Sequence, residues 1–492
     1  MSGIFSELPD ALRLPFAYTE FDPSQADRGL SEMPFNVLLV GQMFETGEAE
    51  PLTLQRPTTT AQADRLFGAG SQLSQMAAGY LGANRLTRMM ALGVNDFDGG
   101  TAATGTLTIS GEVTVATPLC LYVGGVLVRL GVGQGQTAET VAGALAIVVN
   151  SKPGLAVTAA AGENAGEVIF TAKHKGECGN NIDLRLNYQG EESPGGLTFA
   201  FTAMAGGSGN PDAAEVVAAM GSERFHVIAW PWNDADSLRY LKEELDSRWG
   251  PLRQNDGQAI LVKPGTFVEC TTFASSQNNK HLTVFPAEGS PTLPWVYAAV
   301  LMAITAYYGA DDPARPFQTL TLPGVLPGAV SDRWSDFPEK NQALYEGLSV
   351  CGVNDAGQVM ILRAITTYRT NAWGAETQAY LDLNTMLTLS YLRYDWNNYL
   401  QTKYPRHKLA GDDEAKRYGP HQPIMTPKLG RAEAIARFRV WMRAGLVEAP
   451  DDFESRLVVE RNADNPNRLD WLMMPDLVNQ FRVAGTLVRF LL

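Results

Sequence analysis

The sequence is poor in the residues that build disulfide frameworks and metal centres. It has four cysteines and five histidines in 492 residues. The cysteines, at positions 120, 178, 270 and 351, form no C-x-x-C pair and follow no regular spacing. This pattern is typical of reduced, structural thiols in a protein that is made in the cytoplasm.

The histidines are equally uninformative about chemistry, since no H-E-x-x-H or H-x-H motif occurs. His174 and Cys178 are four residues apart, but a metal ion needs more ligands than these two. His226 lies in an apolar run and is most simply a core histidine. His407 and His421 flank a polar loop, where a metal site stays a minor alternative. We therefore expect no metal and no cofactor.

Long apolar runs and an apolar leader are also missing. The longest helix-like apolar stretch, Trp295 to Tyr308, has fourteen residues, which is too short to cross a bilayer and predicts a buried helix. The N-terminal residues carry early acids and prolines at positions 9 and 15, unlike a signal peptide. We expect no direct membrane insertion.

Basic charge is in deficit, with 39 Lys and Arg against 53 Asp and Glu, a net charge of −14 and a pI of about 4.9. Such a chain repels phosphate backbones, which argues against a general nucleic-acid binder. The glycine loop at 206–212, GGSGNPD, lacks the Lys-Ser/Thr of a P-loop, and no G-x-S-x-G occurs. With no catalytic constellation in view, we do not expect an enzyme.

What the sequence does contain is a succession of segments with different character. Strand and helix patterns alternate in two blocks, and a glycine-rich stretch between them holds 21 of the 47 glycines and many short alternating runs. The predicted fold is a multidomain α/β and α+β protein with a mixed α/β core and an inserted β-rich domain. The predicted divisions are an N-terminal arm at 1–30, the core at 31–98 and 210–312, the inserted domain at 99–209, an α+β C-terminal domain at 313–480 and a C-terminal arm at 481–492.

Periodicity places several elements within these segments. The expected helices are 60–80, 138–150, 234–249, 295–308, 376–399 and 428–444. The expected strands include 35–42, 85–93, 359–368 and 452–461.

Both terminal segments have the composition of strands. The last residues, GTLVRFLL, are apolar on both faces and carry one charge, Arg489. The run PFAYTEFDP at 15–23 is extended and bounded by prolines, which suits an edge strand. Each strand needs a partner, either within its own subunit or on another one.

One predicted helix is basic, although the chain as a whole is acidic. Residues 428–443 hold five Lys and Arg and one acid, Glu433. At 100° per residue, Lys428, Arg439 and Arg443 fall on one stripe beside an apolar arc. The stripe is either a solvated face over a core or a surface that docks onto an acidic partner.

Several stretches in a fixed order resemble one protein family. They are PARPFQTLTLPGVLPG at 313–328, the run at 341–371, AYLDLNTMLTLSYLR at 379–393, the run at 445–483 and the apolar terminal strand. The start, LPDALRLPFAYTEFDPSQADRGL, fits as well. Over about residues 1–95 and 210–492, the chain is similar to the tail sheath proteins of contractile-tailed bacteriophages, in the Mu-like branch.

The resemblance implies a structural subunit of the virion tail, assembled in the host cytoplasm. Such subunits form stacked hexameric rings around the tail tube and contract to drive the tube through the host envelope. The implied partners are other copies of the chain, the tail tube protein, and the baseplate and tail terminator proteins.

The resemblance also implies roles for the two arms and for the basic helix. Terminal arms of the family add strands to neighbouring subunits, and the C-terminal domain faces the tube. The residues implied for inter-subunit strand exchange are Phe16, Tyr18, Phe21, Leu487, Val488, Arg489, Phe490, Leu491 and Leu492. Those expected to face the tube are Lys428, Arg431, Arg439 and Arg443.

Two other hypotheses stay open at this point. The parallel-sheet rhythm also suits an α/β enzyme with a β-rich appendage. A different self-assembling virion or surface-layer subunit is the third hypothesis, although the length and the α/β core argue against a tube protein.

Overall fold

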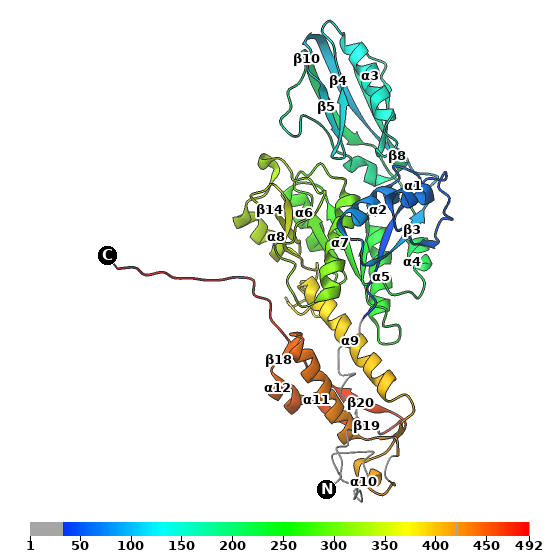
Figure 1. The fold of residues 1–492 in the computed structure, drawn as a ribbon, viewed down its shortest axis with the longest axis vertical. Coiled ribbons are helices and arrows are strands. Elements are labelled where there is room, and N and C mark those ends of the chain that lie inside the picture. The colour runs from blue at the N-terminus through cyan, green and yellow to red at the C-terminus, as the bar shows by residue number, and fades with distance from the viewer. Residues whose placement is uncertain (1–32, 420–421, 492) are drawn as a thin grey trace, which may run out of the picture. The chain divides into compact units, whose positions relative to one another are not determined.

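The computed structural model describes residues 33–419 and 422–491 (Figure 1). The chain forms two compact units. The large unit comprises Pro34–Ser390 together with the C-terminal residues from Gln480, and the small unit comprises Tyr391–Asn479. The domain boundaries expected at 98, 210, 312 and 480 stay predictions, and the expected N-terminal arm lies outside the described residues.

The large unit is built around a six-stranded sheet in the order β13-β12-β11-β1-β3-β2. All neighbouring pairs are parallel except β2 with β3. The strands are β1 (Asn36–Gln42), β2 (Leu54–Gln55), β3 (Arg88–Val94), β11 (Val227–Ala229), β12 (Gln258–Lys263) and β13 (Leu282–Pro286). Because β1 has a strand on each side and helices on its faces, Val37 to Val40 are fully buried.

Helices cover this parallel sheet, as an α/β core requires. They are α1 (Thr60–Phe67), α2 (Gln72–Ala83), α4 (Ala213–Ala219), α5 (Ala235–Trp249), α6 (Phe267–Gln277) and α7 (Pro294–Asp311). The apolar helix α7 packs on β11 and β12 and against α2, so the predicted buried helix is confirmed. No helix among the described residues is long and apolar enough to span a membrane.

The single helix predicted for 60–80 is wrong, because the chain breaks between α1 and α2. Gly68 and Gly70 have φ angles of +86° and +83°, a region that residues with a Cβ rarely adopt. Ser71 then caps α2 by accepting a hydrogen bond from the Ser74 N–H.

The glycine-rich insertion folds into two antiparallel sheets and one α-helix (Figure 1). The first sheet has the order β10-β4-β8-β7 and the second β6-β5-β9. Their strands are β4 (Ala102–Val115), β5 (Leu119–Val123), β6 (Val126–Leu130), β7 (Val157–Ala161), β8 (Glu167–Lys175), β9 (Leu184–Leu186) and β10 (Gly195–Ala205). The helix α3 (Ala138–Asn150) coincides with the predicted helix and packs on the first sheet.

The rest of the large unit holds a short hairpin, β14 (Val350–Val353) with β15 (Val359–Arg363), and the small helix α8 (Asn341–Tyr345). The strand predicted for 359–368 ends at Arg363. The hydroxyl of Ser349 accepts a hydrogen bond from the Ile365 N–H and donates one to its carbonyl, both at 2.9 Å. This side chain takes the place of a neighbouring strand, so the ladder stops.

The chain passes into the small unit within α9 (Leu383–Lys403), which begins seven residues later than the helix predicted from 376. The small unit also contains α10 (Asp412–Ala415), α11 (Pro427–Arg443), α12 (Pro450–Arg456) and three two-stranded sheets. These pair β16 (Lys408–Leu409) with β17 (Ile424–Met425), β18 (Val447–Glu448) with β21 (Asp476–Leu477), and β19 (Val458–Arg461) with β20 (Leu469–Leu472). The strand predicted for 452–461 is therefore α12 followed by β19, because Pro450 starts a helical turn that ends at Arg456.

Candidate assembly surfaces

The apolar C-terminal arm is extended and pairs with no strand of the described residues. From Val478 to Leu491 no helix or strand forms, and Figure 1 shows this stretch as a single extended trace. The exposed fractions of Leu487, Val488 and Phe490 are 79%, 75% and 78%. Among the described residues, the arm therefore does not pair within its own subunit, and Leu492 lies outside them. Exposed apolar side chains in such a row mark an interaction segment.

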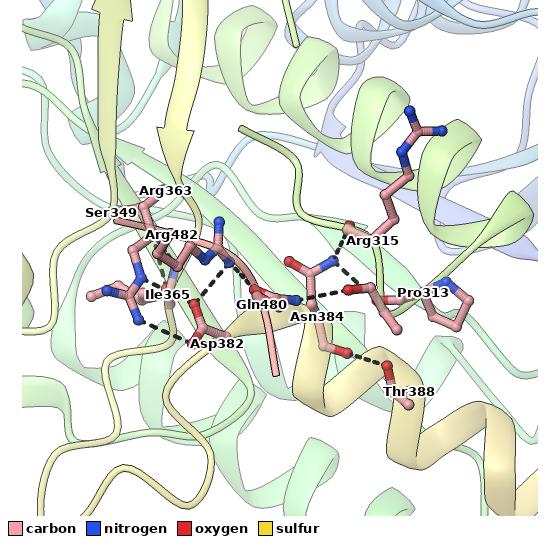
Figure 2. A network of polar contacts seen from close by, with 11 residues as sticks. Pro313, Arg315, Ser349, Arg363, Ile365, Asp382, Asn384, Thr388, Gln480 and Arg482 are labelled. Carbon is pink, nitrogen blue, oxygen red and sulfur yellow. Dashed lines mark hydrogen bonds and ion pairs between the residues drawn. The ribbon is translucent and has the colours of Figure 1, made fainter. Parts of the chain in front are cut away.

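The root of the arm, in contrast, is bound to the large unit (Figure 2). The Gln480 side chain donates to the Ala314 carbonyl at 3.0 Å. The Arg482 guanidinium donates to the Asp382 carboxylate at 3.1 Å, and Asp382 also accepts two hydrogen bonds of 3.1 Å from Arg363. Sequence reasoning missed this cluster, because its members lie far apart in the chain and no local pattern marks them.

The aromatic residues of the N-terminal arm, Phe16, Tyr18 and Phe21, lie outside the described residues. Their role in strand exchange stays a prediction.

The basic helix α11 begins as the sequence predicts, with Thr426 accepting from the Leu429 N–H and Pro427 in the first turn. One of its arginines is structural. Arg437 is buried and donates from Nε to the Asp395 carboxylate at 2.6 Å, and the Trp441 indole N–H donates to the same carboxylate at 2.6 Å. A buried charge needs such a partner, so Arg437 fastens α11 to α9.

The four residues expected to face the tube have different surroundings. Arg431 donates to the main-chain carbonyls of Glu454 and Leu457 at the end of α12, so its guanidinium is already engaged within the small unit. Lys428, Arg439 and Arg443 are exposed. Exposed ammonium and guanidinium groups on one stripe are available to an acidic surface.

Arg439 and Arg443 border a groove between α11 and α12 with a volume of about 190 Å³. Its lining is mixed. Ile435, Phe438, Met442 and Phe453 supply apolar surface, and Asp451 and Glu454 supply negative charge. The groove therefore adds apolar contact area next to the two arginines.

The hairpin of β19 and β20 has a free edge on each side within the described part of the small unit. Apolar side chains next to these edges are exposed, among them Val458, Leu472 and Met474. An open edge with apolar neighbours is a suitable template for an added strand.

Metal-ligating groups are not assembled in the described residues. No cluster of three or more His, Cys, Asp or Glu side chains is placed to hold a metal ion there. Burial raises the pKa of Cys178, Cys270 and Cys351 to about 12, so these thiols stay protonated at neutral pH. Burial lowers the pKa of His226 to about 3, and its ring stacks on Phe35, as expected of a neutral core histidine.

Comparison with known proteins decides the family. A model of the phage tail sheath protein central domain matches residues 206–367, and a model of the phage tail sheath C-terminal domain matches residues 375–489. The tail sheath protein of the Mu-like prophage FluMu from Haemophilus influenzae is 39% identical over 493 residues, covering 100% of both chains. The chain belongs to the phage tail sheath family, in its Mu-like branch.

A solved sheath structure is similar to this chain in fold. The helical sheath of the anti-feeding prophage in its contracted state has a TM-score of 0.50 at 10% identity, covering 98% of this chain and 99% of that one. A sheath tail protein from Desulfitobacterium hafniense has a TM-score of 0.49 at 12% identity, covering 94% and 100%. Family membership confirms the predicted relationship and makes this sheath protein a structural component of a phage tail, not an enzyme.

Proposed function

We propose that this sheath protein polymerises as stacked hexameric rings around a tail tube and contracts to drive the tube through the host envelope. The observation that carries the proposal is the C-terminal arm, which is bound at its root and apolar, extended and exposed beyond it. We also propose assembly in the host cytoplasm and contacts with baseplate and tail terminator proteins. The β-rich insertion would form an outer domain.

Strand exchange gives the arm its missing partner. Each main-chain hydrogen bond formed with a neighbouring edge contributes about 0.5–1.5 kcal/mol net. Burying Val488, Phe490 and Leu492 adds about 1.5–3 kcal/mol for each side chain. The link between two copies is then worth several kcal/mol, and a paired strand can turn about its root without separating.

The free edges of the β19–β20 hairpin on a neighbouring copy are suitable acceptors. They belong to a two-stranded sheet, which is marginally stable alone and gains from further strands. The N-terminal residues Phe16, Tyr18 and Phe21 would supply a second donor strand.

The basic stripe of α11 is proposed to face the tube. Exposed ion pairs contribute only about 0–1 kcal/mol each, so they position the sheath on the tube and still release it on contraction. Lys428, Arg439 and Arg443 are the exposed members of this surface. Arg431 would take part only by giving up its bonds to the α12 carbonyls.

Electron microscopy of the full-length chain beside a version truncated after Ala484 tests the assembly proposal. We expect rings or cylinders from the full-length chain and none from the truncated chain. Equal assembly by both would overturn strand exchange by this arm.

A double charge reversal, Arg439→Glu with Arg443→Glu, tests the tube contact. We expect the variant to form sheath-like assemblies alone but to lose co-sedimentation with tail tubes. The matched control reverses Arg406 and Arg456, two exposed arginines outside the stripe. Normal co-sedimentation of the double variant would exclude the proposed tube-facing surface.

A further inference from the structure

The root of the arm lies where the chain returns to the large unit. The chain leaves this unit within α9 and re-enters it at Gln480. Asp382 directly precedes α9, and Arg482 follows the re-entry point, yet the two side chains form an ion pair across 100 residues of sequence. The ion pair therefore links the segment that precedes the small unit in the sequence to the segment that follows it.

Asp382 is itself held firmly by the fold. Arg363, at the end of β15, binds both of its carboxylate oxygens, and the main chain of Asp382 forms a β-bridge with Ile365. A carboxylate fixed in this way still has acceptor capacity, which Arg482 uses. Figure 2 shows Asp382 between the two guanidinium groups.

The loop that receives Gln480 is fixed as well. The Asn384 amide, in the first turn of α9, donates to the carbonyls of Pro313 at 3.0 Å and Arg315 at 2.7 Å. Gln480 binds the carbonyl between them, that of Ala314, and Arg482 also donates to the Gln480 side chain. The root is thus attached to two anchored segments of the large unit.

Exposure is continuous only beyond this attachment. The Arg482 side chain is 13% exposed and Phe481 before it is 81% exposed, whereas every described residue from Val483 onward is exposed. We propose that the Asp382–Arg482 pair is the fixed end of the C-terminal arm, and that both are positioning residues which set where the free segment 483–491 leaves the large unit. This inference rests on the proposed strand exchange.

A fixed root has two physical consequences for exchange. A shorter free segment samples less space, so its effective concentration at a neighbouring edge is higher and it loses less conformational entropy on pairing. The arm also moves with the large unit of its own copy, so a strand paired to a neighbour transmits the motion of that unit.

Limited trypsin digestion of the unassembled full-length chain tests the attachment. Trypsin cuts after exposed arginines, so we expect cleavage after Arg489 but at least about ten-fold slower cleavage after Arg482. Asp382→Asn should bring cleavage after Arg482 close to that after Arg489. The control Asp311→Asn, on an exposed residue near the same loop, should behave like the unchanged chain. Equal cleavage at both arginines in the unchanged chain would overturn the proposal.

A second variant, Arg482→Met, tests the consequence for assembly while Asp382 keeps its two bonds to Arg363. We expect at least about a ten-fold loss of assembled particles with an unchanged unfolding temperature of the unassembled chain. The control Arg315→Met makes the same change nearby, on a side chain that points away from the network in Figure 2. We expect it to assemble normally.

The two proposals fail in different ways. Normal assembly of Arg482→Met, together with loss of assembly on truncation after Ala484, would overturn the positioning role and leave strand exchange intact. Normal assembly of the truncated chain would overturn strand exchange, whereas protection of Arg482 from trypsin would still report the attachment.

Discussion

Strand β1 and the C-terminal arm have nearly the same kind of sequence and opposite environments. NVLLVGQ in β1 has β3 on one side and β11 on the other, and Val37 to Val40 are fully buried. TLVRFL in the arm, Thr486 to Leu491, has no strand on either side among the described residues, and its apolar side chains are exposed. Apolar, β-forming composition therefore indicates that a segment needs cover, while the neighbouring edges decide whether its own chain provides that cover.

The largest effect should come from placing charge on the arm. Val488→Asp with Phe490→Asp would bury two carboxylates in an exchanged strand, and neither would have a partner. We expect complete loss of rings and cylinders in electron micrographs. The unfolding curve of the unassembled chain should not change, because both side chains are exposed there. Normal assembly of this variant would mean that the arm does not become buried on assembly, and that it does not need the cover that β1 has.

The same substitution in the two strands should differ sharply in its effect on stability. Leu39→Ala removes a fully buried side chain from β1 and should lower the free energy of unfolding by about 2–5 kcal/mol in urea titrations of the unassembled chain. Leu487→Ala is the matched control and should leave the titration unchanged. A similar loss for both variants would mean that the arm packs on its own chain in solution.

Strand β7 lies at the edge of its sheet, and there a side chain, not a strand, binds the main-chain groups of the edge. Asn150, at the end of α3, donates to the Ala159 carbonyl at 2.7 Å and accepts from the Ala159 N–H at 2.9 Å. Asn150→Ala should lower the free energy of unfolding by about 1–3 kcal/mol, because two main-chain groups lose their partner. Asn150→Asp keeps the acceptor but turns a carboxylate oxygen toward the Ala159 carbonyl, so it should not recover the loss. Light scattering of the unassembled Asn150→Ala variant should also reveal association through the opened edge.

The smallest effect concerns pH at the end of β1, where His226 contacts Asn36. Burial, assisted by Arg224, lowers the pKa of His226 from 6.5 to about 3. Between these values the unfolded chain binds a proton that the folded chain does not, so stability falls on acidification, by up to about 1.4 kcal/mol per pH unit. His226→Gln should reduce this slope in urea titrations between about pH 7 and pH 5. An unchanged slope would mean that water reaches this end of the sheet.

Much of the fold could be predicted from periodicity and capping residues. The helices α3, α7 and α11 follow from apolar spacing and from start signals such as Thr426-Pro427. Element ends were less accurate. The glycines between α1 and α2 and the Ser349 hydroxyl beside Ile365 both stop an element, and the second acts from sixteen residues away.

The candidate surfaces divide in the same way. The apolar arm and the basic stripe of α11 are visible in the sequence because composition and helical spacing are local properties. Whether each arginine is buried, bonded or exposed cannot be read from the sequence. Arg437 is buried with Asp395, Arg431 binds the carbonyls of α12, and Arg439 stays exposed.

The sequence by itself determined the order of most elements and the family relationship, and it predicted that the terminal residues need cover. Tertiary structure alone decided that Arg482 would meet Asp382 and that the arm beyond it would lie open. The physical reason is that periodicity records which side chains avoid water, whereas ion pairs and strand edges depend on which distant segments the folded chain brings together.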